Sequence, residues 1–260
     1  MIRAILRGPL GRGLKRTEPS GIGGEGGVAI SWPEHLQMND ALVGQPGGAI
    51  TAGTDGGGPP HPGRLEWLRP FTTRFVEEVT SALERLDIEA VDRVVTTLAH
   101  ARDDGHVIFV AGNGGSAATA SHWVNDLAKA TRSAGLPYVR AISLTDSTPW
   151  MTALANDEGY ERVFAGQLEN MARPGDVLVV ISASGNSPNL VRAVEYARAN
   201  GVETMGLLGF DGGLLRTMVD HTIWIETPLG AYGLAENVHS VVCDLVTSCL
   251  AQPTSPYRGQ

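Results

Sequence analysis

The feature that most constrains the fold is an alternation, from residue 106 onward, of short β-branched runs with segments of helical periodicity. The apolar runs are HVIFVAG, YVRAISL, DVLVVISA, ETMGLLG and HTIWIE, and helical patterns fall between most of them and after the last. Parallel strands cannot be joined by tight hairpins, so each needs a crossover, and the helices supply these crossovers. The alternation therefore predicts an α/β fold: a doubly wound, five-stranded parallel sheet flanked by helices, with its ligand at the carboxyl ends of the strands.

Two amphipathic helices precede the first of these strands. The segments RLEWLRPFTTRFVEEVTSALERL and DIEAVDRVVTTLAHARDDG both carry apolar residues at helical spacing. The second is expected to be capped by Asp87 and to end at Gly105, because aspartate is a good N-cap and glycine a good helix terminator.

The first part of the chain has a different composition. Residues 1–63 hold nearly half of the 33 glycines and show no sustained apolar period, which predicts a disordered Gly/Pro-rich segment. We therefore expect one globular domain over residues 64–253 and a short tail over residues 254–260. Met38 is a candidate for the true start of the protein.

Charge and hydropathy exclude several classes of protein. The net charge of −8 argues against a nucleic-acid binder, although the first sixteen residues hold five basic side chains and no acid. There is neither a secretory signal nor a stretch of about 20 apolar residues, so no membrane span is expected. The only cysteines, Cys243 and Cys249, lie on different faces of one predicted helix, which makes a disulfide implausible and fits a reducing cytoplasm.

A glycine-rich loop, GNGGSAA, follows the first predicted strand. It is not a P-loop, because that motif needs a lysine after the glycines and this chain has lysine only at positions 15 and 129. It formally matches the dinucleotide pattern G-x-G-x-x-A. That pattern also needs an acidic residue about 20 positions further on, whereas the nearest candidate, Asp146, lies more than 30 residues away. A phosphate cradle for another ligand and a mere tight turn remain.

A serine-rich loop, ISASGNSPNL, follows the third predicted strand. It offers hydroxyls at Ser182, Ser184 and Ser187, and Pro188 is placed to be the first helical residue. Such a loop forms an anion site at a helix N-terminus. Serine and asparagine also cap helices in most proteins, but a single cap does not need this many hydroxyls. Two loops of this kind at adjacent strand ends indicate one phosphorylated ligand.

The motifs GNGGSAATASHWVNDL, TALANDEGY, ISASGNSPN, GFDGG and ENVH resemble the sugar isomerase (SIS) domain, and the resemblance covers roughly Arg64 to Leu250. Within that family they are similar to the phosphoheptose isomerases, which interconvert sedoheptulose 7-phosphate and a heptose 7-phosphate. The resemblance implies a cytoplasmic homotetramer with active sites at subunit interfaces. It also implies a phosphate site formed by Ser182, Ala183, Ser184 and Ser187. The sugar site that it implies is formed by Asn113, Gly114, Gly115, Ser116, Asn156 and Asp157. Ala183 stands where a threonine is common.

Aldose–ketose isomerisation needs a base near carbon, an acid near oxygen and a group that stabilises the oxyanion of an enediol. His122 and Asp126 share one helix face, being four residues apart. On the last predicted helix, Glu236 is followed by His239 and Asp244, and a carboxylate amid VVCDLV is costly to bury unpaired. Side chains of these types converging from two helices are able to bind a zinc-like divalent ion.

The resemblance implies specific roles for four of these residues. Metal ligands of the phosphoheptose isomerases resemble His122, Asp126, Glu236 and Asp244 by position. Of these, Asp126 corresponds to the base and Asp244 to the acid. Three of the four differ in side chain from the family pattern, and His239 is either a substitute ligand or acid, or a residue at the surface or an interface.

Two classes of function remain open from the sequence. The first is an isomerase of a sugar phosphate, either sedoheptulose 7-phosphate or a different phosphosugar. The second is a non-catalytic SIS module that binds a phosphosugar or a protein partner. The aminosugar synthase branch is disfavoured, because its members use a lysine near the C-terminus and this chain has none there.

Overall fold

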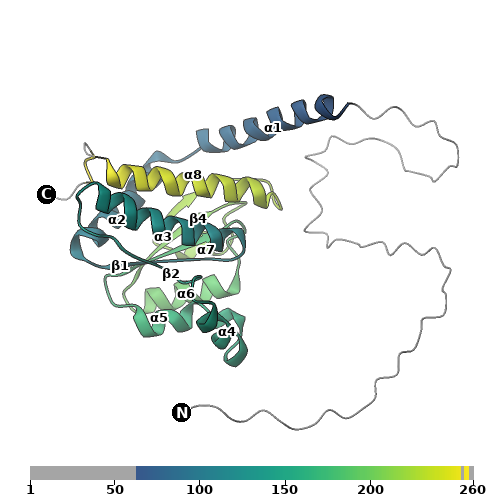
Figure 1. Ribbon diagram of the computed structural model, residues 1–260. Coiled ribbons are helices and arrows are strands. Elements are labelled where there is room, and N and C mark those ends of the chain that lie inside the picture. Colours follow the sequence, from purple (N-terminus) through teal and green to yellow (C-terminus); the bar gives the residue numbers. More distant parts are fainter. Residues whose placement is uncertain (1–62, 253–254, 258–260) are drawn as a thin grey trace, which may run out of the picture. The chain divides into compact units, whose positions relative to one another are not determined.

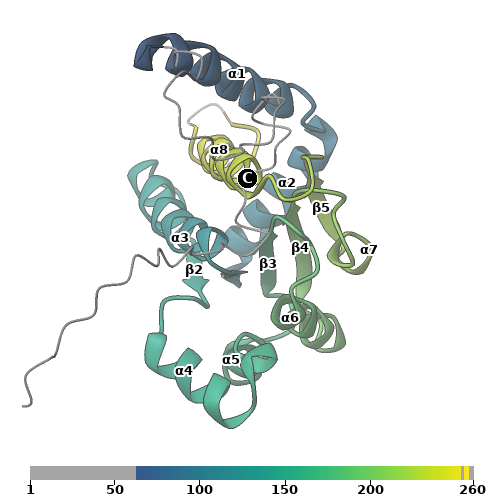
Figure 2. The same ribbon diagram turned by 90° about the vertical axis from the view of Figure 1, so that its right-hand side faces the viewer.

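The computed structural model describes residues 63–252 and 255–257, and it confirms the predicted sheet. Its strands, all parallel, run in the order β2-β1-β3-β4-β5 (Figures 1 and 2). Their bounds are β1 Val107–Gly112, β2 Arg140–Ser143, β3 Val177–Ser182, β4 Glu203–Leu208 and β5 His221–Trp224. Apart from Gly63, the predicted disordered segment with Met38 lies outside the described residues, as does most of the predicted tail.

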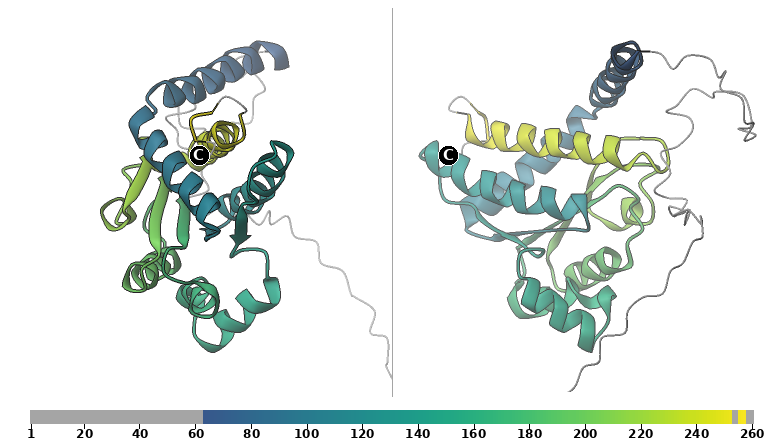
Figure 3. Two further views of the ribbon diagram at one scale, coloured as in Figure 1. Left: turned by 90° about the vertical axis from the view of Figure 1, so that its left-hand side faces the viewer. Right: turned by 45° about the vertical axis from the view of Figure 1, so that its right-hand side comes forward.

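Helices cover both faces of the sheet, as a doubly wound fold requires (Figures 2 and 3). One face carries α2 (Ile88–Asp104), α3 (Gly115–Ser133) and α8 (Tyr232–Ala251). Packed on the other are α4 (Thr148–Asp157), α5 (Ala165–Met171), α6 (Pro188–Ala199) and α7 (Leu215–Met218). The one-turn 3-10 helix η2 (Tyr160–Arg162) joins α4 to α5, and α1 (Arg64–Glu84) contacts α8.

Successive side chains of each strand point alternately to the two faces of the sheet, and so to the two helical layers. In β1, Ile108 and Val110 join the cluster under α2, α3 and α8, whereas Phe109 and Ala111 join the cluster under α5 and α6. All six residues of β1 are buried, which explains its unbroken apolar run.

The ends of α2 follow the sequence signals. The Asp87 carboxylate accepts hydrogen bonds from the backbone N–H groups of Glu89 and Ala90, at 3.0 and 3.1 Å. Gly105 ends the helix in the left-handed region, with φ of 73°. Both predicted boundaries are therefore confirmed, and each rests on chemistry local to the chain.

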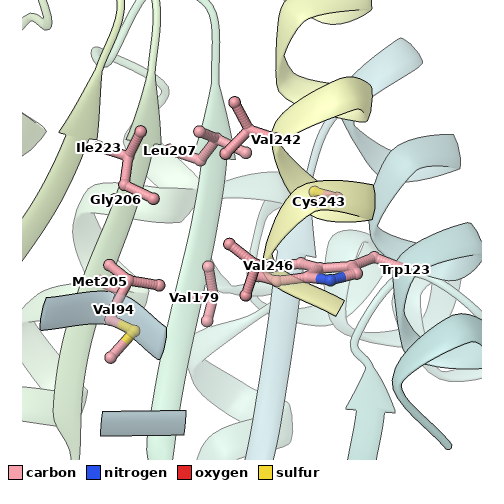
Figure 4. A pocket seen from close by; sticks show the side chains of 10 residues that line it. All are labelled: Val94, Trp123, Val179, Met205, Gly206, Leu207, Ile223, Val242, Cys243 and Val246. Atoms are coloured by element: carbon pink, nitrogen blue, oxygen red, sulfur yellow. The ribbon is translucent and has the colours of Figure 1, made fainter. Parts of the chain in front are cut away.

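The layer between the sheet and α8 is closely packed and apolar. Figure 4 shows Trp123 of α3 and Cys243 of α8 beside strand residues such as Val179 and Met205. The cavity they line has a volume of about 10 Å³, which is scarcely enough for one water molecule. The indole N–H of Trp123 donates a hydrogen bond to the Thr247 hydroxyl, at 3.0 Å. This layer is core, and a ligand site must lie elsewhere.

Both cysteines are free thiols. None of the helices in the described part of the chain is long and apolar enough to cross a lipid bilayer.

Candidate active site

A pocket of about 240 Å³ opens where the carboxyl ends of β1 and β3 meet. After β1 the chain crosses to β2, and after β3 it crosses in the opposite direction to β4, so the two following loops diverge at this point. In open α/β sheets such a switch point leaves a crevice for ligands. The pocket is lined by Asn113, Gly114, Gly115, Ser116, Ile181, Ser182, Ala183, Ser184, Ser187, Tyr232 and Glu236.

The glycine-rich loop forms one wall and leads directly into α3. A Cβ on Gly112 would lie 2.6 Å from the Ser116 carbonyl oxygen, so this tight turn requires glycine. The helix N-cap, Gly114, has φ of 54° and contributes no side chain. The first-turn N–H groups of α3 are therefore left without a side-chain cap, and the positive end of the helix dipole lies at the pocket.

The serine-rich loop forms the opposite wall, and its hydroxyls divide into two kinds. Ser182 and Ser184 accept hydrogen bonds from the loop's own N–H groups, those of Gly185 at 3.0 Å and Asn186 at 3.3 Å. Ser187 is the N-cap of α6, yet its side chain accepts no hydrogen bond from that helix. Helix capping thus does not account for Ser187, whose hydroxyl lines the pocket.

The segment GFDGG and the two leucines that follow it support the serine-rich loop. The Gly185 carbonyl accepts a hydrogen bond from the N–H of Leu215, at 2.9 Å, and the Asn186 side-chain oxygen accepts one from the N–H of Leu214, also at 2.9 Å. These contacts hold the loop in a fixed shape before any ligand arrives. A preformed donor array loses less entropy on binding than a mobile loop.

No lysine, arginine or histidine is among the residues that line the pocket, and its single acidic side chain is Glu236. Burial raises the pKa of Glu236. Its carboxylate lies directly over Gly115, at the N-terminus of α3, where a Cβ would come within 2.4 Å of it. The pocket would therefore hold an anion through N–H dipoles and hydroxyls.

His122 and Asp126 form the predicted pair on α3, with Nε2 and Oδ2 3.2 Å apart. The His122 side chain is 60% exposed, and neither residue lines the pocket. Asp244 is exposed on α8, so the cost of burying an unpaired carboxylate does not apply to it. The helix turns its neighbour Cys243 toward the core and Asp244 toward solvent. Burial chiefly, and then Asp244 and Asp126, raise the pKa of the Cys243 thiol, which places both carboxylates near that thiol.

The four predicted metal ligands do not form one cluster within the described residues. No three histidine, cysteine, aspartate or glutamate side chains in residues 63–252 and 255–257 gather closely enough to hold a metal ion. Glu236 lines the pocket, whereas His122, Asp126 and Asp244 lie outside its lining. The residues of this single chain therefore do not fit a zinc site as they stand.

Asn156 and Asp157, which the resemblance placed near the sugar, are exposed at the end of α4. The Asn156 amide donates to the Asp157 carboxylate, at 2.8 Å, and neither residue lines the pocket. Three residues that the sequence reasoning missed do bear on the site: Tyr232 lines it, and Asn189 and Tyr160 contact Asn113. The second asparagine of GNSPN was the available signal for Asn189.

His239 is buried, with 1% exposure, so the expectation of a surface or interface position is wrong for this chain. Neither of its ring nitrogens has a hydrogen-bond partner of good geometry among the described residues. Burial lowers the pKa of His239 to about 4, and the nearby backbone of Leu208 opposes this shift only partly. The imidazole is therefore neutral at physiological pH.

This burial predicts a pH-dependent stability. Between about pH 6.5 and pH 4 the unfolded chain binds a proton at His239 that the folded chain does not, so the free energy of unfolding falls as pH falls through this window. The expected loss is roughly 3 kcal/mol. Urea unfolding at pH 7 and pH 4.5 measures it, with His239→Gln as the control that removes the titration. Equal losses in both proteins would show that other groups cause the effect.

The fold and pocket define the class: a doubly wound α/β protein with an anion-binding pocket at the switch point of its sheet. The sequence pattern of the SIS domain matches residues 73–209, which is more than half of the chain. The chain therefore belongs to the SIS domain family, and its relatives place it among the phosphoheptose isomerases.

Curated relatives and solved structures agree on this placement. The phosphoheptose isomerase of Trichlorobacter lovleyi is 35% identical over 187 residues, covering 69% of this chain and 93% of the relative. That of Geotalea daltonii is 45% identical over 159 residues, covering 59% and 80%. The structure of phosphoheptose isomerase from Neisseria gonorrhoeae superposes with a TM-score of 0.63 at 28% identity, covering 71% of this chain and 98% of that one.

Proposed function

We propose that this protein is a phosphosugar isomerase that interconverts sedoheptulose 7-phosphate and heptose 7-phosphate. The observation that carries the proposal is the pocket itself, in which the glycine-rich loop, the serine-rich loop and the carboxylate of Glu236 meet. The first two supply donors for a phosphate, and the third supplies a proton acceptor beside it. The family relationship to named phosphoheptose isomerases supports the choice of substrate.

The phosphate and the sugar take separate parts of this pocket in the proposal. Ser182, Ser184, Ser187 and the N–H of Ala183 hold the phosphate at the N-terminus of α6, which compensates its charge. Asn113, Gly114, Gly115 and Ser116 face the sugar from the opposite wall. Asn156 and Asp157 would reach the sugar only through a movement of α4 or across a subunit boundary.

The reaction transfers one proton between the two carbons and one proton between their two oxygens. A base removes a proton from the first carbon of the ketose, and the released electron pair forms a double bond to the second carbon while the carbonyl oxygen gains a proton. The enediol then takes a proton at the second carbon, and the first hydroxyl loses its proton to give the aldose. Glu236 is placed for proton transfer because it lines the pocket and its pKa is raised by burial.

The roles of Asp126 as base and Asp244 as acid stay predictions. Asp244 is exposed on α8, and Asp126 is partly exposed on α3. We propose that self-assembly completes the site there, in a homotetramer with its active sites at subunit interfaces. Apolar side chains exposed on α1 and α8 support such assembly: Leu65, Trp67, Leu68, Phe75, Val76, Val241 and Leu245. The same assembly would have to bring further ligands to any zinc ion, and no step above depends on one.

The test is incubation of the full chain with sedoheptulose 7-phosphate, with and without added zinc, followed by NMR for aldose formation and for solvent exchange of the carbon-bound proton. We expect turnover in the wild type and a loss of about 100-fold or more in Glu236→Ala, because alanine cannot accept the proton. Asp126→Asn and Asp244→Asn are assayed alongside. If both retain wild-type activity, their predicted roles are wrong.

A non-catalytic SIS module is the second candidate. The observation in its favour is that the predicted base and acid, Asp126 and Asp244, both lie outside the pocket lining. Such a module would bind sedoheptulose 7-phosphate without any exchange of the carbon-bound proton. If binding without exchange is found at every zinc concentration, the isomerase proposal is wrong and the non-catalytic module is favoured.

We further propose that the SIS domain of this protein spans residues 64–253 and that the protein acts in the cytoplasm.

A further inference from the structure

Two asparagine side chains join the walls of the pocket. The Nδ2 of Asn113, in the loop after β1, donates to the Oδ1 of Asn189 at 3.0 Å, and the Nδ2 of Asn189 donates back to the Oδ1 of Asn113 at 2.8 Å. Asn189 is the second residue of α6 and is 2% exposed, whereas Asn113 lines the pocket. A reciprocal amide pair thus ties the glycine-rich loop to the helix that begins at the serine-rich loop.

The backbone fixes which way round this pair lies. The N–H of Leu190, which can only donate, lies 3.0 Å from the Oδ1 of Asn189 and shares its hydrogen with the Ser187 carbonyl, also at 3.0 Å. If the Asn189 amide were turned over, its NH₂ group would face this N–H, donor against donor. The oxygen of Asn189 must therefore stay beside Leu190, and its NH₂ group must stay on Asn113.

Asn189, once oriented, in turn fixes the orientation of the Asn113 side-chain amide. The Oδ1 of Asn113 accepts hydrogen bonds from Asn189 and from the Tyr160 hydroxyl, at 2.8 and 3.1 Å, so both of its acceptor positions are filled. One hydrogen of its Nδ2 is used on Asn189. The second has no acceptor in the hydrogen bonds of the described residues, and it belongs to a side chain that lines the pocket.

We propose that Asn189 and Tyr160 are positioning residues that make Asn113 present one N–H donor, and no acceptor, to the ligand. For the identity of that ligand this inference rests on the proposed function. The chemistry selected is an acceptor oxygen on the sugar part of the sugar phosphate. An unfixed asparagine would spend part of its time with its own oxygen toward that acceptor.

Asn189→Asp tests the orientation with almost no change in shape. Its carboxylate still accepts from Leu190 and from the Nδ2 of Asn113 but cannot donate, so one of its oxygens faces the Oδ1 of Asn113 and the reciprocal pair no longer holds the Asn113 amide in place. We expect KM for sedoheptulose 7-phosphate to rise about 10- to 100-fold, with kcat changed less than about threefold. Tyr160→Phe removes one of the two donors to Asn113, and KM should rise about threefold.

Asn200→Asp is the matched control. Asn200 follows α6, is exposed, and donates to the Tyr196 carbonyl, so this variant adds the same charge near the same helix without touching Asn113. Its KM should equal that of the wild type. If folded Asn189→Asp keeps a wild-type KM, or if Asn200→Asp raises KM as much, the inference is wrong.

A second readout needs neither turnover nor ligand. In ligand-free protein labelled with ¹⁵N-asparagine, the Asn113 side-chain NH₂ signals are assigned by their loss in Asn113→Ala. We expect them to shift in Asn189→Asp and in Tyr160→Phe but not in Asn200→Asp. The exposed Tyr160 position keeps the test available if Asn189→Asp does not fold. Unshifted signals in Tyr160→Phe would overturn the inference, whereas absence of wild-type turnover would overturn only the proposed function.

Discussion

Replacing Gly115 by alanine is expected to lower kcat/KM about 100-fold or more while the protein stays folded. The new Cβ would lie 2.4 Å from the carboxylate of Glu236, which is the far end of a flexible side chain and so moves aside. The backbone of Gly115 is not in the left-handed region, so alanine fits this helix start without strain. The substitution therefore acts by displacing the Glu236 carboxylate, and a displacement of about 1 Å is enough for a loss of activity of this size.

Steady-state kinetics measure the expected loss of kcat/KM, and thermal unfolding shows whether the variant stays folded. Gly233→Ala is the matched control, because Gly233 also lies in the first turn of a helix and a Cβ there meets no atom within 4 Å. A double-mutant cycle identifies the cause. Once Glu236 is alanine, adding Gly115→Ala should cost nothing further, because the Cβ no longer meets a carboxylate. A full additional loss in the double variant would refute the role given to Glu236.

The sequence predicted the sheet because strand and helix periodicities are local. The five apolar runs, the cap at Asp87 and the stop at Gly105 each depend on residues within a few positions of one another. The two loops were also predictable, since glycine, serine and proline at fixed offsets after a buried strand leave few other structures. Their meeting at one pocket followed from the parallel order of the strands.

What the sequence did not predict depends on which side of a helix faces the core. Cys243 and Asp244 are adjacent, and the pattern VVCDLV did not show that the carboxylate points outward beside a buried thiol. His239 is the opposite case, a polar side chain directed into the core without a hydrogen-bond partner of good geometry among the described residues. The contact between Asn113 and Asn189 spans 76 positions in sequence, so no local pattern indicated it.

Gly185 holds the shape of the phosphate loop, and alanine in its place is expected to remove sugar-phosphate binding. Its φ of 64° is costly for any residue with a Cβ. That Cβ would also lie 1.9 Å from the Gly212 carbonyl oxygen, a backbone atom that cannot rotate away. Because Gly185 donates to Ser182 and accepts from Leu215, a shift here moves the hydroxyls and the supporting GFDGG segment together.

The expected cost of Gly185→Ala is roughly 3 kcal/mol in the free energy of unfolding, the sum of backbone strain and overpacking. Gly135→Ala separates the two contributions, since Gly135 has φ of 70° but a Cβ there meets nothing within 4 Å. It should cost about 1 kcal/mol and leave binding unchanged. Calorimetry with sedoheptulose 7-phosphate, at a temperature where both variants are folded, measures the difference. If Gly185→Ala binds as tightly as Gly135→Ala, the phosphate is not held by the serine-rich loop, because no rearrangement that relieves a 1.9 Å contact leaves that loop in place.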